Sequence, residues 1–568
     1  MAGTSWTKWR ALTVRRNALG LGHGAHGLRS SQKMFMGCRM QSTATAATPK
    51  AGVWGTYSLI GGCLASGLVG YQLASNTKSE DVKRNAVDSP RFGSPEDFRK
   101  AIDELRATFP SEGAVSTNPD DLQAHGFSAA NTYHKGVPHS VVVYPLSTED
   151  VVKIVKIANK FLMPIVAYSG ATSLEGQFIG RQGGGICVDV SGMDKIIAIH
   201  ESDSDIVCQP GVGWMDINET LKEKGIPLFF PIDPAPSATV GGMLSTGCSG
   251  TNAVRYGTAK GEWFLNATIV LPSGEVIKTR QRSRKSSAGF DVTKLFIGAE
   301  GTLGIVTEVT IRLAPVLPTT VAIAQFPDVR KATEAVEEIL NKGVGIQCIE
   351  LCDAAFMDAT NLYGPSARKY AVTDHLFFKF QGPTQASLKE TARIVQEVVK
   401  KHGGGKWMQA KDEEEAADMW NDRKNAHYTG IMYGGQGSKG IATDVCVPVS
   451  KLPDLVYETQ KDIERSGLKG PIVGHAGDGN FHSLLLVKNE EEMAVARDVV
   501  HRMVERAIAL DGTCTGEHGV GIGKREYLYE ELGEGTVELM KTIKNAIDPK
   551  GLFNPGKLYP DPKPSKRD

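Results

Sequence analysis

The chain has 568 residues and no net charge, with 41% hydrophobic and 23% charged residues. This length predicts two or more domains, the composition is that of a soluble globular protein, and the zero net charge gives no support to a nucleic-acid partner. Nine cysteines lie scattered without a CxxC pair or a CxxCH run. Their spacing excludes the attachment motif of a c-type haem and disfavours a disulfide framework or a zinc cluster.

The N-terminal region is basic and lacks acids. No Asp or Glu precedes Glu80, whereas Lys and Arg recur among many Ser, Thr, Ala and Gly residues. This composition is typical of a mitochondrial presequence. We therefore expect a presequence over residues 1–40 and a mitochondrial location, with a disordered basic tail as the alternative.

An uncharged stretch follows at residues 52–74. A helix of that length, at ~1.5 Å per residue, spans the ~30 Å hydrocarbon core of a bilayer. Lys50 and the basic leader precede the stretch, and Glu80 and Asp81 follow it. The positive-inside rule then predicts an inner-membrane anchor with the protein body facing the intermembrane space. The alternative is one long presequence that is removed whole, which leaves the body in the matrix.

Hydrophobic periodicity predicts an α+β protein. Residues 75–134 are expected to form a linker and a first helix. Strands are expected from Ser140 to Tyr144 and from Pro164 to Tyr168, with a helix opening at Ser147 between them, so the body begins with a β-α-β unit. The composition shifts after Pro315, and we expect two α+β domains joined near residues 315–320. In the second domain, helices are predicted at Lys331–Asn341, Gln385–His402, Glu413–His427 and Glu490–Leu510, and strands at His375–Phe380 and Phe481–Val487.

Three glycine-rich segments are candidates for binding a cofactor. Backbone N–H groups and hydroxyls of the first segment can hold a pyrophosphate, and paired glycines of the second let the backbone approach a flat ring. The candidate residues of the first segment are Ser169, Gly170, Ala171, Thr172, Ser173 and Leu174. Those of the second are Pro234, Ser237, Thr239, Gly241, Gly242, Gly247 and Asn252. Those of the third are Glu300, Gly301, Gly304, Ile305 and Val306, and Asn554 is added near the C-terminus.

In this order, the segments resemble the PCMH-type FAD domain of the vanillyl-alcohol oxidase superfamily. The resemblance covers residues 135–315 and implies an FAD held across two small α+β subdomains. It places the pyrophosphate at Gly170 to Ser173. A GxGxxG match from Gly22 to Gly27 follows no predicted strand and lies within the expected presequence, so it is not a Rossmann fingerprint and nicotinamide dependence is not expected.

A second kind of site is indicated by His475-Ala-Gly-Asp-Gly-Asn-Phe-His482. Two histidines seven residues apart are ~10.5 Å apart along a helix, which is too far to share an ion. The intervening Gly, Asp, Gly and Asn instead predict a tight turn that folds both imidazoles toward one point. Two ordinary histidines beside a polar turn are the alternative.

Glu517 and His518 supply the remaining chemistry. His475, His482 and Glu517 form a His₂Glu set suited to Zn²⁺ or Mn²⁺ with an open position for substrate. His518 is adjacent in sequence but free of the metal, and it is the natural proton acceptor.

These segments, together with Asp444 to Pro448 and Asn554 to Lys557, closely resemble the FAD-linked D-lactate dehydrogenase (cytochrome) family over residues 95–560. The resemblance implies a substrate (cap) domain with the metal site over residues 316–540 and a C-terminal segment, 541–560, that returns to the FAD domain. It further implies that His518 is the catalytic base and that Arg423 binds the substrate carboxylate. It also implies electron transfer from D-lactate through FAD to cytochrome c.

Other substrates remain open at this point. Relatives that oxidise D-2-hydroxyglutarate carry Lys-Tyr-Asp where this chain has Ala442-Thr443-Asp444, and Asn where it has Leu484. A substrate with one carboxylate therefore fits better than a diacid. A D-2-hydroxyglutarate or glycolate dehydrogenase of the same family, an oxidase that reduces O₂, and a catalytically inactive flavin-binding subunit are the alternatives.

Overall fold

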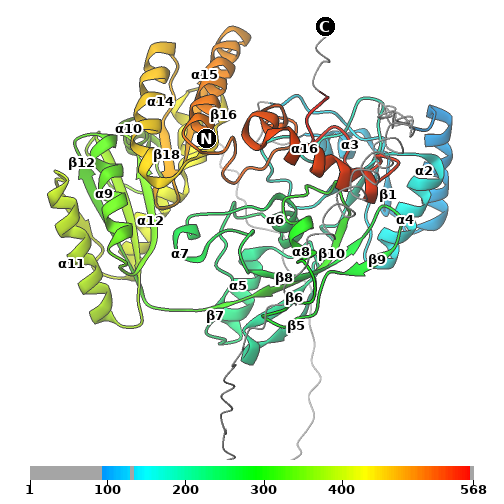
Figure 1. Ribbon diagram of the computed structural model, residues 1–568, viewed down its shortest axis with the longest axis horizontal. Helices are drawn as coiled ribbons and strands as arrows, with labels where there is room; N and C mark the ends of the chain where they lie inside the picture. The colour runs from blue at the N-terminus through cyan, green and yellow to red at the C-terminus, as the bar shows by residue number, and fades with distance from the viewer. Residues whose placement is uncertain (1–91, 128–133, 563–568) are drawn as a thin grey trace, which may run out of the picture. The chain divides into compact units, whose positions relative to one another are not determined.

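The computed structural model describes residues 92–127 and 134–562, which all lie in one compact unit from Val87 to Asp568 (Figure 1). The expected presequence, the candidate membrane anchor and part of the expected linker lie outside the described residues. Within those ranges, no helix is both long and apolar enough to cross a bilayer.

The described chain begins with a small sheet of strand order β1-β2-β4-β3, in which β2 and β3 both run parallel to β4. The predicted β-α-β unit is confirmed as β2, α4 and β3, and Ser147 caps α4 by accepting a hydrogen bond from the Asp150 amide at 3.1 Å. The elements are α2 (Pro95–Thr108), β1 (Val115–Ser116), α3 (Pro119–His125), β2 (Val141–Val143), α4 (Thr148–Phe161), β3 (Ile165–Tyr168) and β4 (Ile186–Asp189).

A second, antiparallel sheet follows with strand order β5-β6-β10-β8-β9. Its apolar core also contains residues of α5, α6 and α8. The elements are β5 (Ile196–His200), β6 (Asp205–Cys208), α5 (Trp214–Glu223), β7 (Leu228–Phe229), α6 (Val240–Thr246), α7 (Ala253–Tyr256), β8 (Phe264–Val270), β9 (Val276–Lys278), α8 (Thr293–Phe296), β10 (Ile305–Arg312) and β11 (Ala314–Pro315).

The largest sheet lies in the C-terminal half, with strand order β15-β12-β14-β13-β18-β19-β16 and β17 paired to β19. Its elements are β12 (Thr319–Phe326), α9 (Val329–Asn341), β13 (Ile346–Cys352), α10 (Ala354–Tyr363), β14 (Asp374–Gln381), α11 (Gln385–Lys401), β15 (Trp407–Gln409), α12 (Glu413–Lys424), α13 (Ala426–Tyr433), β16 (Lys439–Ala442), β17 (Val445–Cys446), α14 (Leu452–Ser466), β18 (Ile472–His475), β19 (Asn480–Val487) and α15 (Glu490–Ala509).

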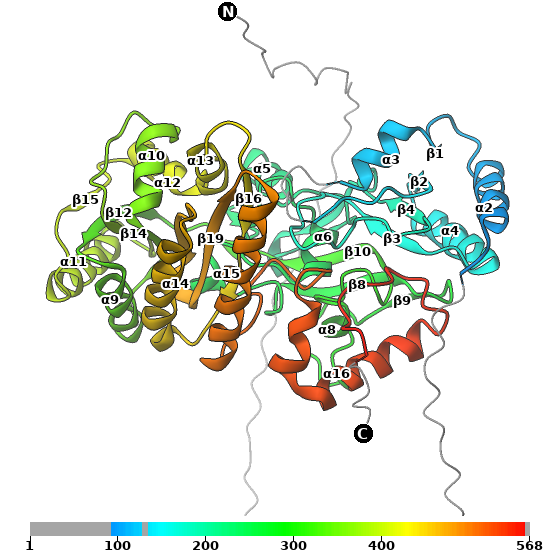
Figure 2. The same ribbon diagram turned by 90° about the horizontal axis from the view of Figure 1, so that it is seen from above.

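Helices cover both faces of this sheet, as Figure 2 shows. Side chains alternate between the two faces along each strand. In β12, Ala322 and Ala324 therefore join the core formed with α9, α11, α14 and α15. Val321 and Ile323 join the core formed with α10 and α12. The second core positions the helix that carries Arg423.

The helices and strands predicted for the second domain are confirmed, with one exception. Glu413–His427 was expected to be a single helix, and that prediction is wrong: α12 ends at Lys424 and α13 begins at Ala426. The Asn425 side chain donates to the Asn421 carbonyl at 2.9 Å. Asn425, between the two helices, has φ −83° and ψ 13°, which departs from helical geometry and ends α12.

The chain ends beside its first sheet. After α16 (Leu528–Ile547), Leu552 and Phe553 join the apolar core of β2, β3 and β4. The Asn554 amide donates to the Ile165 carbonyl at 2.8 Å. The C-terminal segment therefore lies next to the strand that leads into the first glycine-rich loop.

Candidate active site

A hairpin brings the two predicted metal-binding histidines together. β18 ends at His475, a short 3-10 turn follows over Ala476–Asp478, and β19 starts at Asn480 and carries His482. The two imidazole rings lie 5.4 Å apart between centroids. Gly479 closes the turn with φ +76°, and a Cβ there would lie 2.0 Å from the Val447 carbonyl oxygen. Only glycine fits this position.

Glu517 completes the set. Its Oε1 lies 3.1 Å from His475 Nε2 and 3.1 Å from His482 Nε2. The three candidate ligand atoms all lie within 4.8 Å of one another. Burial would raise the pKa of Glu517, but the two histidines hold it well below its ordinary value, so the carboxylate is ionised.

The other nitrogen of each histidine is held from outside this set. His475 Nδ1 donates to the Glu350 carboxylate at 3.0 Å, and His482 Nδ1 donates to the Thr443 carbonyl at 2.9 Å. These bonds leave both Nε2 atoms facing Glu517, which is the arrangement of metal-binding histidines oriented by outer partners. The donor set therefore fits a divalent ion with oxygen and nitrogen ligands.

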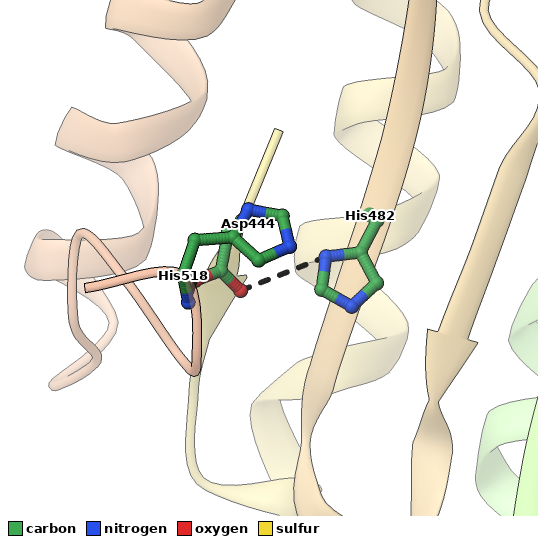
Figure 3. A group of neighbouring side chains, drawn as sticks. All are labelled: Asp444, His482 and His518. Atoms are coloured by element: carbon green, nitrogen blue, oxygen red, sulfur yellow. Dashed lines mark hydrogen bonds and ion pairs between the residues drawn. The ribbon is translucent and has the colours of Figure 1, made fainter. Parts of the chain in front are cut away.

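A second group, Asp444, His482 and His518, is also compact enough to hold an ion (Figure 3). The Asp444 carboxylate is already hydrogen-bonded by four donors of the protein. Oδ1 accepts from Asn480 Nδ2 at 2.8 Å, and Oδ2 accepts from Thr515 Oγ1 and the Glu517 and His518 amides at 2.7–2.9 Å. Asp444 thus shapes the loop that carries Glu517 and His518, and the His475 group is the better metal site.

His518 lies against the predicted metal site without being part of it. Its ring stacks on His482 with centroids 4.9 Å apart and an interplanar angle of 11°. Burial lowers the pKa of His518, which keeps the imidazole neutral. Its Nδ1 is buried and has no hydrogen-bond partner within the described chain. The residue can therefore accept a proton from a bound molecule.

Arg423 is placed beside the site but is engaged with another residue. Its guanidinium Nη2 donates to Glu350 at 2.6 Å, and the same carboxylate holds His475. Arg423 Nε and His427 Nε2 are buried without a hydrogen-bond partner among the described residues. Burial lowers the pKa of His427, and the nearby His518 acts in the same direction. Neither Glu350 nor His427 was singled out from the sequence.

The three glycine-rich loops meet in the structure. The Thr239 hydroxyl donates to Ser169 Oγ at 2.8 Å, and a Cβ on Gly170 would lie 2.6 Å from the Ser237 carbonyl oxygen. The Glu300 amide donates to the Ser245 carbonyl at 2.8 Å. The backbone and hydroxyl groups gathered here fit a diphosphate held by a nest of N–H groups, as FAD requires.

Other predicted flavin residues have packing roles in the protein. A Cβ on Gly241 would lie 2.5 Å from Pro210, and one on Gly304 would lie 2.6 Å from Ile269. Asn252 donates from Nδ2 to the Pro231 carbonyl and accepts from Gln347. The rest lie in the loops or at their edges: Ala171, Thr172, Ser173, Leu174, Pro234, Gly242, Gly247 and Gly301 in loops or on α6, and Ile305 and Val306 at the start of β10.

Several hydrogen bonds join the loops to the metal-site segment. Gln177 Nε2 donates to the His518 carbonyl at 2.7 Å. The Glu300 carboxylate accepts from the Val520 and Gly521 amides at 2.7 and 2.9 Å, while burial raises its pKa to about 7. Asn554 Nδ2 donates to the carbonyls of Gln177 and Glu300. The candidate flavin loops and the candidate base thus form one connected site.

Comparison with known proteins identifies both halves of the chain. Residues 139–280 match the family model for an FAD binding domain, and residues 318–558 match that for the C-terminal domain of FAD linked oxidases. The fold resembles 4-ethylphenol oxidase from Gulosibacter chungangensis, with a TM-score of 0.69 and 18% identity over 83% of this chain and 99% of that one.

Two curated relatives are similar over most of their length. The mitochondrial D-lactate dehydrogenase [cytochrome] of Arabidopsis thaliana is 40% identical, covering 86% of this chain and 85% of the relative. D-lactate dehydrogenase [cytochrome] 1, mitochondrial, of Saccharomyces cerevisiae is 38% identical, covering 92% and 93%. The chain therefore belongs to the FAD-linked D-lactate dehydrogenase (cytochrome) family, as its motifs predicted.

Proposed function

We propose that this protein oxidises D-lactate to pyruvate with FAD as the oxidant and passes the electrons to cytochrome c. One observation carries the proposal: the His475, His482 and Glu517 group and the neutral His518 lie on segments that the candidate flavin loops hold in place. Two curated family members named D-lactate dehydrogenase [cytochrome] support the substrate and the acceptor.

Unpaired polar atoms indicate the kind of substrate. Arg423 Nε, His427 Nε2 and His518 Nδ1 are all buried and lack protein partners in the described chain. Because buried polar groups are normally paired, these atoms favour a bound molecule with hydrogen-bonding oxygens. A carboxylate suits the guanidinium, and a hydroxyl suits the neutral imidazole.

Two side chains of the paired strands β16 and β19 favour a substrate with one carboxylate. Ala442 ends β16 and pairs with Leu484 of β19, whose side chain is buried. Neither side chain offers a charge to a second carboxylate. D-Lactate or glycolate therefore suits the site better than D-2-hydroxyglutarate.

The residues have separate roles in the proposed reaction. Arg423 orients the substrate carboxylate, and His475, His482 and Glu517 hold Zn²⁺ or Mn²⁺. His518 takes the hydroxyl proton as the C2–H bond of D-lactate breaks. When bound, FAD supplies a hydride acceptor at N5 and the metal lowers the pKa of the substrate hydroxyl. Loss of the hydroxyl proton to His518 and of the C2 hydride to FAD converts D-lactate to pyruvate.

The location follows in part from the same family. Both curated relatives are named mitochondrial, and we propose a mitochondrial location here. The presequence at 1–40 and the inner-membrane anchor at 52–74 remain predictions, as do the domain limits at 315 and 540. Alkaline carbonate extraction of mitochondria tests the anchor: the protein stays with the membranes if 52–74 is retained and is released if it is not.

A metal-depletion experiment tests the chemistry of the site. FAD-loaded protein treated with a chelator should lose flavin reduction by D-lactate and regain it with Zn²⁺ or Mn²⁺. His482→Ala should lose both the metal and the activity while keeping FAD. Full activity in chelated, metal-free protein would contradict the proposed metal role, and slow reduction by D-lactate with fast reduction by a diacid would contradict the substrate.

A further inference from the structure

Ser249 connects a candidate flavin loop directly to a candidate metal ligand. The residue lies between Gly247 and Asn252, in the loop after α6, and its side chain is buried. Its hydroxyl donates to Glu517 Oε2 at 2.8 Å. Neither residue is near the other in the sequence, so the contact exists only in the folded protein.

The two oxygens of Glu517 are used differently. Oε1 faces the Nε2 atoms of His475 and His482 at 3.1 Å each, where an ion would be held. Oε2 faces Ser249. The backbone amide of Glu517 is fixed separately by Asp444 at 2.8 Å. The Glu517 backbone is therefore held by Asp444, between β16 and β17, whereas the Glu517 carboxylate is oriented by Ser249 of the candidate flavin loop.

This division has an energetic consequence. A glutamate side chain is long and loses rotamer freedom when it is fixed. A hydrogen bond that holds it before the ion arrives reduces that loss at the moment of binding. Each histidine of the group already has such a partner, Glu350 for His475 and Thr443 for His482. Ser249 gives the third ligand the same support.

We propose that Ser249 is a positioning residue that orients Glu517 for the metal. The inference rests on the metal site of the proposed function. It adds that the loop assigned to flavin binding also sets the metal affinity. One carboxylate oxygen of Glu517 would bind the ion, and the other accepts a hydrogen bond from Ser249 of the candidate flavin loop.

The test measures the dissociation constant of Zn²⁺ and of Mn²⁺ by competition with a chelator, on FAD-loaded protein without substrate. Loss of an outer partner typically weakens metal binding by about 10- to 100-fold, and we expect that change in Ser249→Ala. Ser249→Thr keeps the hydroxyl and should bind close to the wild-type value. Ser283→Ala, an exposed serine of the same half of the chain whose hydroxyl bonds only the Lys285 carbonyl, is the matched control.

The flavin spectrum of each variant shows whether the loop itself is intact. Weaker metal binding in Ser249→Ala with a wild-type flavin spectrum supports the inference. Metal binding in Ser249→Ala equal to that of wild type overturns it and leaves the proposed function standing. Wild-type protein that binds neither ion overturns the metal site and, with it, this inference. In a Glu517→Gln background, Ser249→Ala should cause no further loss, and a full additional loss contradicts action through Glu517.

Discussion

At the scale of single residues, buried charges determine the shape of the site. Asp444 is fully buried and accepts hydrogen bonds from a hydroxyl, a side-chain amide and two backbone amides. Glu350 is also fully buried and is shared by Arg423 and His475. Removing one member of such a buried pair leaves an uncompensated charge and is strongly destabilising. Both carboxylates therefore fix the positions of residues that we propose to bind the substrate or the metal.

His139 gives a pH dependence that can be measured apart from the metal site. Its Nε2 donates to the Phe178 carbonyl at 3.1 Å, and burial lowers its pKa from 6.5 to about 4. Between these values the unfolded chain binds a proton that the folded protein does not. Stability therefore falls as the pH drops through 6.5, and the group accounts for about 2 kcal/mol of loss between pH 7.5 and 5.

Urea unfolding at the two pH values checks this contribution. His139→Gln retains a donor for the Phe178 carbonyl but does not titrate, so its free energy of unfolding should fall less than that of wild type between pH 7.5 and 5. Equal losses in both proteins would show that His139 does not carry this dependence.

At the scale of elements, the β18–β19 hairpin brings the two histidines of the proposed metal site together. Its turn requires Gly479 because the backbone has φ +76° and the Val447 carbonyl lies where a Cβ would be. Gly467, at the end of α14, has a similar φ of +74° but no atom within 4 Å of its Cβ position. Alanine substitution at Gly467 therefore measures backbone strain alone, whereas alanine substitution at Gly479 measures strain and steric clash together.

Gly467→Ala should cost about 1 kcal/mol of stability, the penalty of a left-handed backbone with a Cβ. Gly479→Ala should cost about 1–3 kcal/mol more, because the clash adds to the strain. It should also weaken metal binding, since the turn sets the separation of His475 and His482. Thermal unfolding and metal titration of the two variants measure these effects, and equal losses would refute a clash at Gly479.

Local pattern made part of this architecture predictable. The helices α9, α11 and α15 and the strands β14 and β19 have strong periodicity, and each agrees with its prediction to within a few residues. The break at Asn425 was missed because the residues on both sides of it are helical, and a one-residue departure from helical geometry leaves no mark in a hydrophobic pattern.

The site was predictable where its residues are close in sequence. The spacing of His475 and His482 and the adjacency of Glu517 and His518 were enough to propose the metal group. Ser249 and His427 reach the site through tertiary contacts, which a single sequence does not reveal. Glu350 carried one signal that was not used: it is a charged residue inside the apolar run of β13, and such a residue is seldom buried without a partner.

At the scale of the whole molecule, the C-terminal segment joins the glycine-rich loops. Asn554 has φ +43°, and its Nδ2 donates to the Gln177 and Glu300 carbonyls at 2.9 and 2.7 Å. The Lys544 ammonium donates to the Thr302 and Phe553 carbonyls. The end of the chain thus holds two loops that lie far apart in the sequence.

Asn554→Asp should weaken FAD binding by about 10- to 100-fold. Aspartate tolerates the same backbone conformation but cannot donate, so two hydrogen bonds of about 1 kcal/mol each are lost. Asn159→Asp is the matched control, because Asn159 Nδ2 also donates to two carbonyls, those of Val155 and Pro272, away from the loops. Flavin fluorescence during dilution measures the affinity, and equal weakening in both variants would point to general destabilisation.

We propose that this chain oxidises D-lactate by proton transfer to His518 and hydride transfer to FAD. Anaerobic stopped-flow mixing of FAD-loaded protein with D-lactate, L-lactate, glycolate and D-2-hydroxyglutarate tests it most directly. We predict fast flavin bleaching by D-lactate, slowed by about 10²- to 10⁴-fold in His518→Ala and reversed by oxidised cytochrome c. A bound flavin that D-lactate does not bleach, or that bleaches equally fast in His518→Ala, would contradict the account.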